Sequence, residues 1–258
     1  MTNIAVEATA TGTAKEAVAA TEEAVPTVKN MTPAARTIAI DEAMARSGLY
    51  GFLALIYRQE PTQQLLEQLE GPAYRNLLLD IGIDVNKDIA EAGSTREEVI
   101  QELAVEYAHL FIGPGKHISP YESVYTEGGE AGIYGKATVA VKHFIESVGY
   151  EYQSEFHGLP DHICVELEFL QSLTCMEAHM YREHDPDAVN QLRIIQKDFI
   201  NMHMVKWVPV FCKEVIDTAT LSFYRAMARL TADFLALEIE EANGTRGRNL
   251  KDPRVLSQ

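Results

Sequence analysis

The sequence contains few cysteines, and their pattern excludes two common kinds of small-domain architecture. The three cysteines, Cys164, Cys175 and Cys212, are odd in number, widely spaced and form no CxxC pair. Neither a disulfide framework nor a structural zinc site is therefore indicated. We expect buried free thiols in a reducing cytosol.

Positive charge is also scarce. The chain has 22 Lys and Arg residues against 38 Asp and Glu residues, which gives a formal net charge of −16. Binding to a phosphate backbone needs clustered basic side chains, so a nucleic-acid-binding function is disfavoured. Docking on an anionic membrane is disfavoured for the same reason. An acidic surface either attracts a basic peptide at long range or serves solubility alone.

Long apolar runs and export signals are absent from the sequence. No apolar stretch approaches the ~18 residues that a membrane-spanning helix needs. The first 25 residues have neither a basic start nor a continuous apolar segment, and the sequence contains no Arg-Arg pair. A secretory or twin-arginine leader is therefore not indicated, and the prediction is a cytoplasmic protein.

The composition along the chain predicts one folded domain between two polar ends. Residues 1–32 are rich in Ala, Thr, Val and Glu and contain no aromatic residue, which favours a flexible N-terminal extension or at most a weak helix. Residues 33–242 form the predicted all-helical domain. Residues 243–258 are predicted to be a polar C-terminal tail.

Helical periodicity dominates residues 33–242. Thr32-Pro33 is a helix-start signal, and apolar residues recur at helical spacing after it. No alternating strand pattern is visible, so we predict an all-α fold, a single globular bundle of many helices. Pro209 is expected to kink or split one helix, and the Gly/Pro-rich segment 113–135 is expected to be a loop. The expected helices span 34–58, 62–69, 72–80, 95–111, 136–148, 160–183, 187–217 and 219–242.

Three pairs of side chains have spacings seen in metal sites. Glu106 and His109 form a single Glu-x-x-His, but a di-iron bundle needs that motif twice together with two further glutamates. The pairs His162/Glu166 and Cys175/His179 share one helix face each, and each lacks a third or fourth ligand nearby in the sequence. Polar pairs at this spacing are common in helices, so we predict no metal.

Catalytic signatures are missing from the sequence. There is no Gly-x-Ser-x-Gly elbow and no reactive-cysteine signature. Neither GxGxxG nor GxxxxGK[ST] occurs, and the glycines of 113–135 follow a predicted helix rather than a strand. We therefore predict a binding module, not an enzyme, with no cofactor of its own.

Three segments carry a resemblance to a known family. The first reads EYAHLFIGP over residues 106–114 and continues as PYESVY over 120–125. The second reads LPDHICVELEFL over 159–170, and a weaker third reads HMVKWVPVF over 203–211. In their order and separation they resemble the TorD/DmsD family of redox-enzyme maturation chaperones, which is distantly related to the NarJ chaperones. The resemblance spans roughly residues 45–240.

The resemblance implies a cytoplasmic chaperone of the all-helical TorD/DmsD type. Such a chaperone binds the N-terminal signal region, often a twin-arginine signal, of an apo-molybdoenzyme catalytic subunit. It delays export and holds the enzyme ready for insertion of the molybdopterin cofactor. Some members form homodimers by exchanging helices. The resemblance does not identify the client enzyme, nor does it show whether guanine nucleotide or the molybdenum cofactor binds directly.

The same motifs suggest which residues bind the signal peptide. An exposed Asp161 carboxylate at a helix start would pair with a guanidinium, or it would simply cap the helix. His162 would contact the peptide or brace the Gly/Pro-rich loop. Glu122 and Ser123 would bind the peptide or cap the return of that loop. Phe111, Leu167, Phe169 and Trp207 are expected in the core. The predicted signal-peptide-binding residues are Glu122, Ser123, Tyr125, Pro160, Asp161, His162 and Glu166.

The predicted mechanism is groove binding, with the apolar part of the signal in a hydrophobic cleft and carboxylates facing its arginines. Two alternatives stay open. One is a helical protein that binds guanine nucleotide or metal, which a nucleotide-binding assay would identify. The other is a structural assembly subunit that remains in the mature oxidoreductase.

Overall fold

The computed structural model describes residues 29, 31–80, 83–113, 117–126, 135–150 and 158–243. The predicted N-terminal extension and C-terminal tail lie almost entirely outside these residues. Within them, all regular elements are helices, apart from one isolated β-bridge, which confirms the all-α class. No helix in these ranges is both long and apolar enough to cross a membrane.

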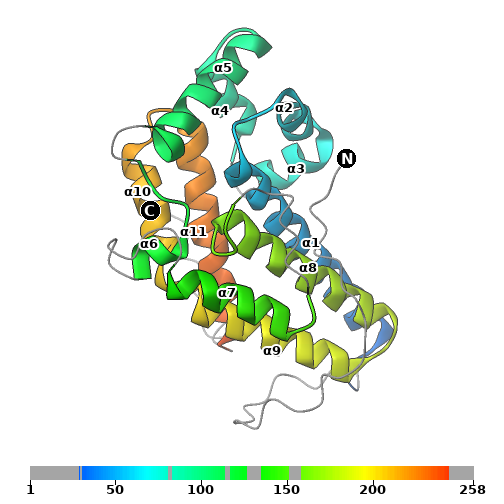
Figure 1. Ribbon diagram of the computed structural model, residues 1–258. Helices are drawn as coiled ribbons and strands as arrows, with labels where there is room; N and C mark the ends of the chain where they lie inside the picture. Colours follow the sequence, from blue (N-terminus) through cyan, green and yellow to red (C-terminus); the bar gives the residue numbers. More distant parts are fainter. Residues whose placement is uncertain are drawn as a thin grey trace, which may run out of the picture.

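Eleven α-helices, one π-helical turn and one 3-10 turn make up this described part (Figure 1). In chain order they are α1 (Pro33–Arg58), α2 (Gln63–Glu70), α3 (Pro72–Asp80), α4 (Val85–Ala92), α5 (Arg96–Tyr107), η2 (Ala108–Ile112), α6 (Glu122–Thr126), α7 (Lys136–Ser147), α8 (Ile163–Arg182), α9 (Pro186–Met202), η3 (Met204–Lys206), α10 (Val208–Thr218) and α11 (Ser222–Ala242).

Local signals place most helix starts where the sequence predicts them. The Thr32 hydroxyl accepts from the Ala35 N–H at 3.2 Å, with proline at the first helical position of α1. Thr95 and Glu98 form a reciprocal capping box at the start of α5. The helix predicted over 187–217 is split into α9, η3 and α10, with Pro209 in the first turn of α10. Two short helices, α4 and α6, were not predicted.

Helices α1 and α8 run side by side through the middle of the molecule and share its most extensive helix–helix contact (Figure 1). Helices α9 and α11 complete the layer around them. The four residues predicted to lie in the core, Phe111, Leu167, Phe169 and Trp207, are all buried. Aromatic rings fill the interior in edge-to-face pairs, such as Tyr57 against Phe211 with centroids 5.3 Å apart.

A buried ionic network ties this central layer together. The Arg46 guanidinium of α1 contacts both Glu238 carboxylate oxygens, with Nη2 at 2.6 Å from Oε2. It also contacts Glu177 of α8 at 3.1 Å and Gln196 of α9 at 2.7 Å. Arg193 binds the other oxygen of Glu177 at 3.2 Å. The two buried carboxylates of this network, Glu177 and Glu238, therefore each have an arginine partner, which offsets the cost of burying their charge.

Candidate functional site

The two family-like motifs meet at an antiparallel bridge between Tyr121 and His162. The Glu122 N–H donates to the Asp161 carbonyl at 3.0 Å, and the Ile163 N–H donates to the Pro120 carbonyl at 2.9 Å. The Tyr121 and His162 rings meet edge to face with centroids 4.9 Å apart. Segments about forty residues apart in sequence are thus joined, and we call residues 120–123 and 160–166 the motif junction.

His162 begins helix α8. Its Nδ1 accepts from the Cys164 N–H at 3.1 Å and lies 3.0 Å from the Cys164 sulfur. An accepting Nδ1 means that the proton of the neutral ring is on Nε2. Burial, and secondly the nearby Arg58 guanidinium, lowers the pKa of His162 to about 3. Burial raises the pKa of the Cys164 thiol to about 12, so the pair lacks the thiolate that a reactive cysteine needs.

Asp161 is fully buried at 0% exposure, so the expectation of an exposed carboxylate is wrong. Its Oδ2 accepts from the Ser123 N–H at 3.1 Å. Asp161 does not cap α8 either, because His162 takes that position. The backbone of the first motif folds over the Asp161 side chain, and this covering shields it from solvent.

Glu166 joins Glu122 and Asp161 in a buried group of three carboxylates. Burial, followed by the charges of Glu122 and Asp161, raises the pKa of Glu166 well above its ordinary value. The third family-like segment supplies the polar partners of this group. The Trp207 Nε1–H donates to Glu166 at 3.2 Å, and the His203 Nδ1 lies 2.9 Å from a Glu122 oxygen.

Of the seven predicted binding residues, only Tyr125 reaches the surface, and it is half-buried. Its hydroxyl donates to Glu214 at 2.8 Å, and its ring packs on Trp207 with centroids 5.6 Å apart. The other six are buried: Glu122, Ser123, Pro160, Asp161, His162 and Glu166. All seven lie at or near the motif junction, but six of them are buried beneath the protein surface.

The Glu-x-x-His pair is divided between the interior and the surface. The Glu106 carboxylate is buried and accepts from the Thr220 hydroxyl and N–H and, at 3.3 Å, from the Leu221 N–H. It therefore caps the start of α11 from another helix. His109 is exposed on η2. Among the described residues, no group of three or more histidine, cysteine or acidic side chains could hold a metal ion.

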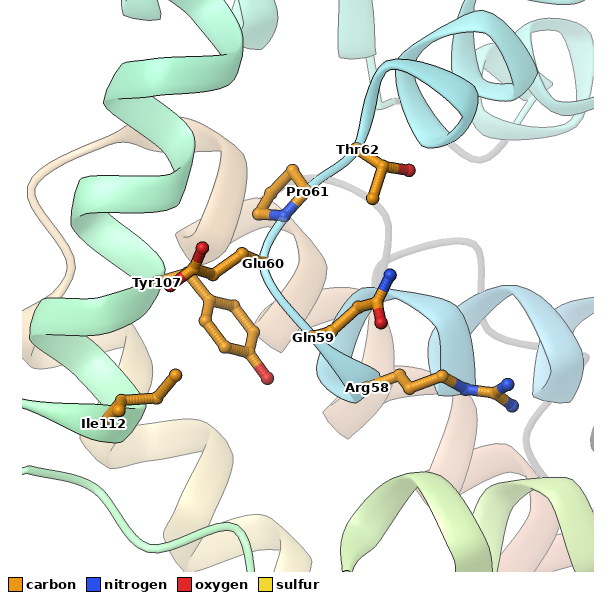
Figure 2. Close-up of a pocket in the computed structure, with 7 residues that line it drawn as sticks. All are labelled: Arg58, Gln59, Glu60, Pro61, Thr62, Tyr107 and Ile112. Atoms are coloured by element: carbon orange, nitrogen blue, oxygen red, sulfur yellow. The ribbon is translucent and has the colours of Figure 1, made fainter. Parts of the chain in front are cut away.

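The first motif also lines a surface pocket of about 440 Å³ at the corner between α1 and α2. Figure 2 shows Tyr107 and Ile112 projecting from α5 and η2 towards the linker that carries Glu60 and Pro61. The Ile112 side chain is 61% exposed, whereas the Tyr107 hydroxyl donates to the Tyr57 carbonyl at 2.9 Å. We call this the corner pocket, and its lining residues are Arg58, Gln59, Glu60, Pro61, Thr62, Tyr107 and Ile112.

Arg58 connects the corner pocket to the motif junction. Its guanidinium forms an ion pair with Glu168, which lies two residues beyond the junction on α8. The same charge contributes to the lowered pKa of His162. The second motif therefore contacts, through Glu168, a residue that lines the corner pocket.

A family model described as "Nitrate reductase delta subunit" matches residues 58–213, which is more than half of the chain. The chain belongs to this family. The matched span contains all three motif segments, and the match confirms their resemblance to TorD/DmsD and NarJ proteins.

Curated relatives of this family match along nearly their whole length. The chaperone protein TorD of Aliivibrio salmonicida is 25% identical over 204 residues, covering 76% of this chain and 93% of the relative. The chaperone protein TorD of Vibrio atlanticus is 26% identical over 212 residues, covering 77% and 95%. A crystal structure described as that of a redox enzyme maturation protein from Archaeoglobus fulgidus covers 74% of this chain and 93% of that one, with 26% identity and a TM-score of 0.45.

Sequence reasoning missed the corner pocket. Arg58, Glu60 and Pro61 lie outside the quoted motifs. The sequence shows that Ile112 is an apolar residue within the first motif, but it does not show that the side chain is exposed. Trp207 was placed correctly in the core, but its hydrogen bond to Glu166 depends on a contact that no local pattern shows.

Proposed function

We propose that this chain is a cytoplasmic chaperone for the maturation of a molybdoenzyme. In this proposal it binds the N-terminal signal region of the apo catalytic subunit and holds that subunit for cofactor insertion. Family membership and the near full-length match to chaperones named TorD carry the proposal. The net charge of −16 supports it, because an acidic surface attracts a basic, arginine-bearing peptide.

Within this function, we infer that the corner pocket receives the peptide. It combines an exposed apolar side chain, Ile112, with an exposed carboxylate, Glu60. That combination fits a signal that has an apolar stretch next to guanidinium groups. Most of the seven residues predicted from the sequence would then support the pocket without contacting the peptide. They would do so because the motif junction holds the first motif and Arg58 in place.

The client is to be identified first. We expect the tagged full-length chain to capture, from its native cytoplasm, a molybdopterin-type catalytic subunit that retains its signal, identified by mass spectrometry. Recovery of only unrelated proteins under cofactor-limited growth would contradict the chaperone function. A chain that co-purifies stoichiometrically with the mature oxidoreductase would instead identify an assembly subunit.

The pocket assignment is tested by Ile112→Ser, with the captured client's signal region as a synthetic peptide in calorimetry. Fully burying an isoleucine side chain contributes about 1.5–3 kcal/mol, and 61% of the Ile112 side chain is still available to be covered. The expected loss is about 1–2 kcal/mol, or roughly 5- to 30-fold in Kd.

Ile194→Ser is the matched control, because Ile194 is 45% exposed on α9 and does not line the corner pocket. Equal affinities of the two variants would refute the assignment of the corner pocket and leave the chaperone function itself intact.

A further inference from the structure

A second surface hollow lies between helix α7 and the C-terminal end of α9, and we call it the α7 groove. Its volume is about 390 Å³. Figure 1 shows α7 along the edge of the molecule beside α9. One wall is formed by Met202 and His203, and the other is a stripe of residues at helical spacing along α7. The α7 residues that line the groove are Lys136, Val139, Ala140, His143, Phe144 and Ser147.

The rim of the groove is apolar and available for contact. Val139 is 64% exposed and Met202 is 51% exposed. Ala140 and Ser147 are small, exposed residues of the same stripe, so a packing element can approach α7 closely. Exposed apolar surface next to polar groups is typical of an interaction site.

The ionisable side chains at the surface of the groove are basic. Lys136 and His143 line it and are exposed, whereas His203 lines it from the buried side. None of the lining residues is acidic, although both helices carry carboxylates elsewhere. The exposed lining therefore complements an apolar segment that carries negative charge.

Lysines are concentrated on the same elements. Of the seven lysines among the described residues, five lie on α7, on α9 or on η3 and α10, which follow α9. In a chain of net charge −16, an acidic partner therefore meets the least repulsion at these elements. The five lysines are Lys136, Lys142, Lys197, Lys206 and Lys213.

The length and the backbone of the walls favour a helix as the occupant. The lining stripe runs from Lys136 to Ser147, about 16 Å, which is the length of a helix of about twelve residues. Backbone groups in the interior of α7 and α9 are already hydrogen-bonded within their own helices, so an extended strand would find no backbone partners there. A helix satisfies its own backbone and packs through side chains alone.

Charge and shape also distinguish between occupants. A second copy bound symmetrically through the same groove would bring two basic linings together. An arginine-bearing signal would be repelled by Lys136. A planar bilayer surface cannot enter a hollow between two helices. These comparisons favour an acidic segment of another protein.

We propose that the α7 groove binds an acidic amphipathic helix of a partner protein. The apolar face of that helix covers Val139 and Met202, and its carboxylates lie beside Lys136 and His143. The groove shares no lining residue with the corner pocket, so a partner in the groove leaves the corner pocket uncovered. The proposal does not depend on the chaperone function or on the assignment of the corner pocket.

Photocrosslinking of the full-length chain in its native cells tests the proposal. Benzoylphenylalanine replaces Val139 in one variant and Ser147 in another, and it replaces Ile194 of α9, which does not line the groove, in a control. We expect protein adducts from the two groove positions and none from the control. Mass spectrometry of the adducts should identify a crosslinked segment with apolar residues at helical spacing and more acidic than basic residues.

Calorimetry with a synthetic peptide of the crosslinked segment then measures the contribution of each groove residue. Val139→Ser should weaken binding roughly 5- to 30-fold, because most of this side chain is available to be covered. Lys136→Glu should weaken it several-fold, and it is not expected to impair folding, because a carboxylate in the first turn of α7 interacts favourably with the helix dipole. Lys87→Glu, an exposed first-turn lysine of α4, is the matched control and should leave the affinity unchanged.

Several results would overturn the proposal. The absence of adducts from both groove positions would do so, as would a crosslinked segment with net positive charge. Covalent dimers would assign the groove to a second copy, and adducts with lipid alone would assign it to a membrane surface. Equal affinities of Lys136→Glu and Lys87→Glu would show that the groove does not select its partner by charge.

Discussion

Substitutions of Asp161 distinguish two roles for its carboxylate: a buried hydrogen bond that stabilises the motif junction, and direct binding of an arginine of the signal peptide. The carboxylate is fully buried, and its Oδ2 accepts from the Ser123 N–H at 3.1 Å. In Asp161→Ala, that buried N–H loses its partner, which costs about 1–3 kcal/mol. In Asp161→Asn, the amide oxygen can still accept the bond, and a negative charge beside Glu166 is removed.

At pH 7 we therefore expect Asp161→Asn to be at least as stable as wild type. Asp161→Ala should be about 1–3 kcal/mol less stable than wild type. Thermal unfolding followed by circular dichroism measures it, because 1 kcal/mol shifts Tm by about 2–4 °C in a chain of this size. Peptide affinity is measured on the same samples by calorimetry. Asp161→Asn should bind within about two-fold of wild type, since a buried carboxylate cannot reach a bound guanidinium.

One result would refute this reasoning. If Asp161→Asn keeps wild-type stability but loses ten-fold or more in affinity, about 1.4 kcal/mol, then the carboxylate contacts the peptide directly. The junction would then have to open on binding. An equal loss of stability in the Asn and Ala variants would instead show that the charge, rather than the hydrogen bond, stabilises the junction.

Two further variants test the buried charges. Arg46→Met should lower the free energy of unfolding by about 3–5 kcal/mol, because Glu238 stays buried without its bidentate partner. Urea titrations measure this change. In the same assay the control Lys29→Met, at an exposed ion pair, should change the free energy of unfolding by less than about 1 kcal/mol. Burial raises the folded-state pKa of Glu166 above its unfolded value, so this residue reduces stability as pH rises from about 4.3 through that higher pKa. Glu166→Gln, whose amide oxygen can still accept from Trp207, should therefore gain stability over wild type between pH 5 and pH 8, and a difference that does not vary with pH would contradict the assignment.

Local sequence signals were enough to predict most of the helices and the family. Capping residues, prolines and apolar periodicity act within a few positions, so the starts of α1 and α5 and the break near Pro209 were readable from local pattern. Helix α6 was missed because it has only 5 residues, too few to show a helical period. Helix α4 was missed as well, although it is as long as the predicted helix α2. The three motif segments were correctly related to one family.

Only the tertiary structure decided which motif residues face solvent. Asp161 looks like a surface cap from its neighbours in sequence, but residues 120–123 fold over it. The partnership of Glu122 with His203 joins residues 81 positions apart, and Ile112 lines one pocket together with residues 58–62 of the α1–α2 corner. Burial and pairing arise from contacts between remote segments, and such contacts leave no periodic trace in the sequence around either residue.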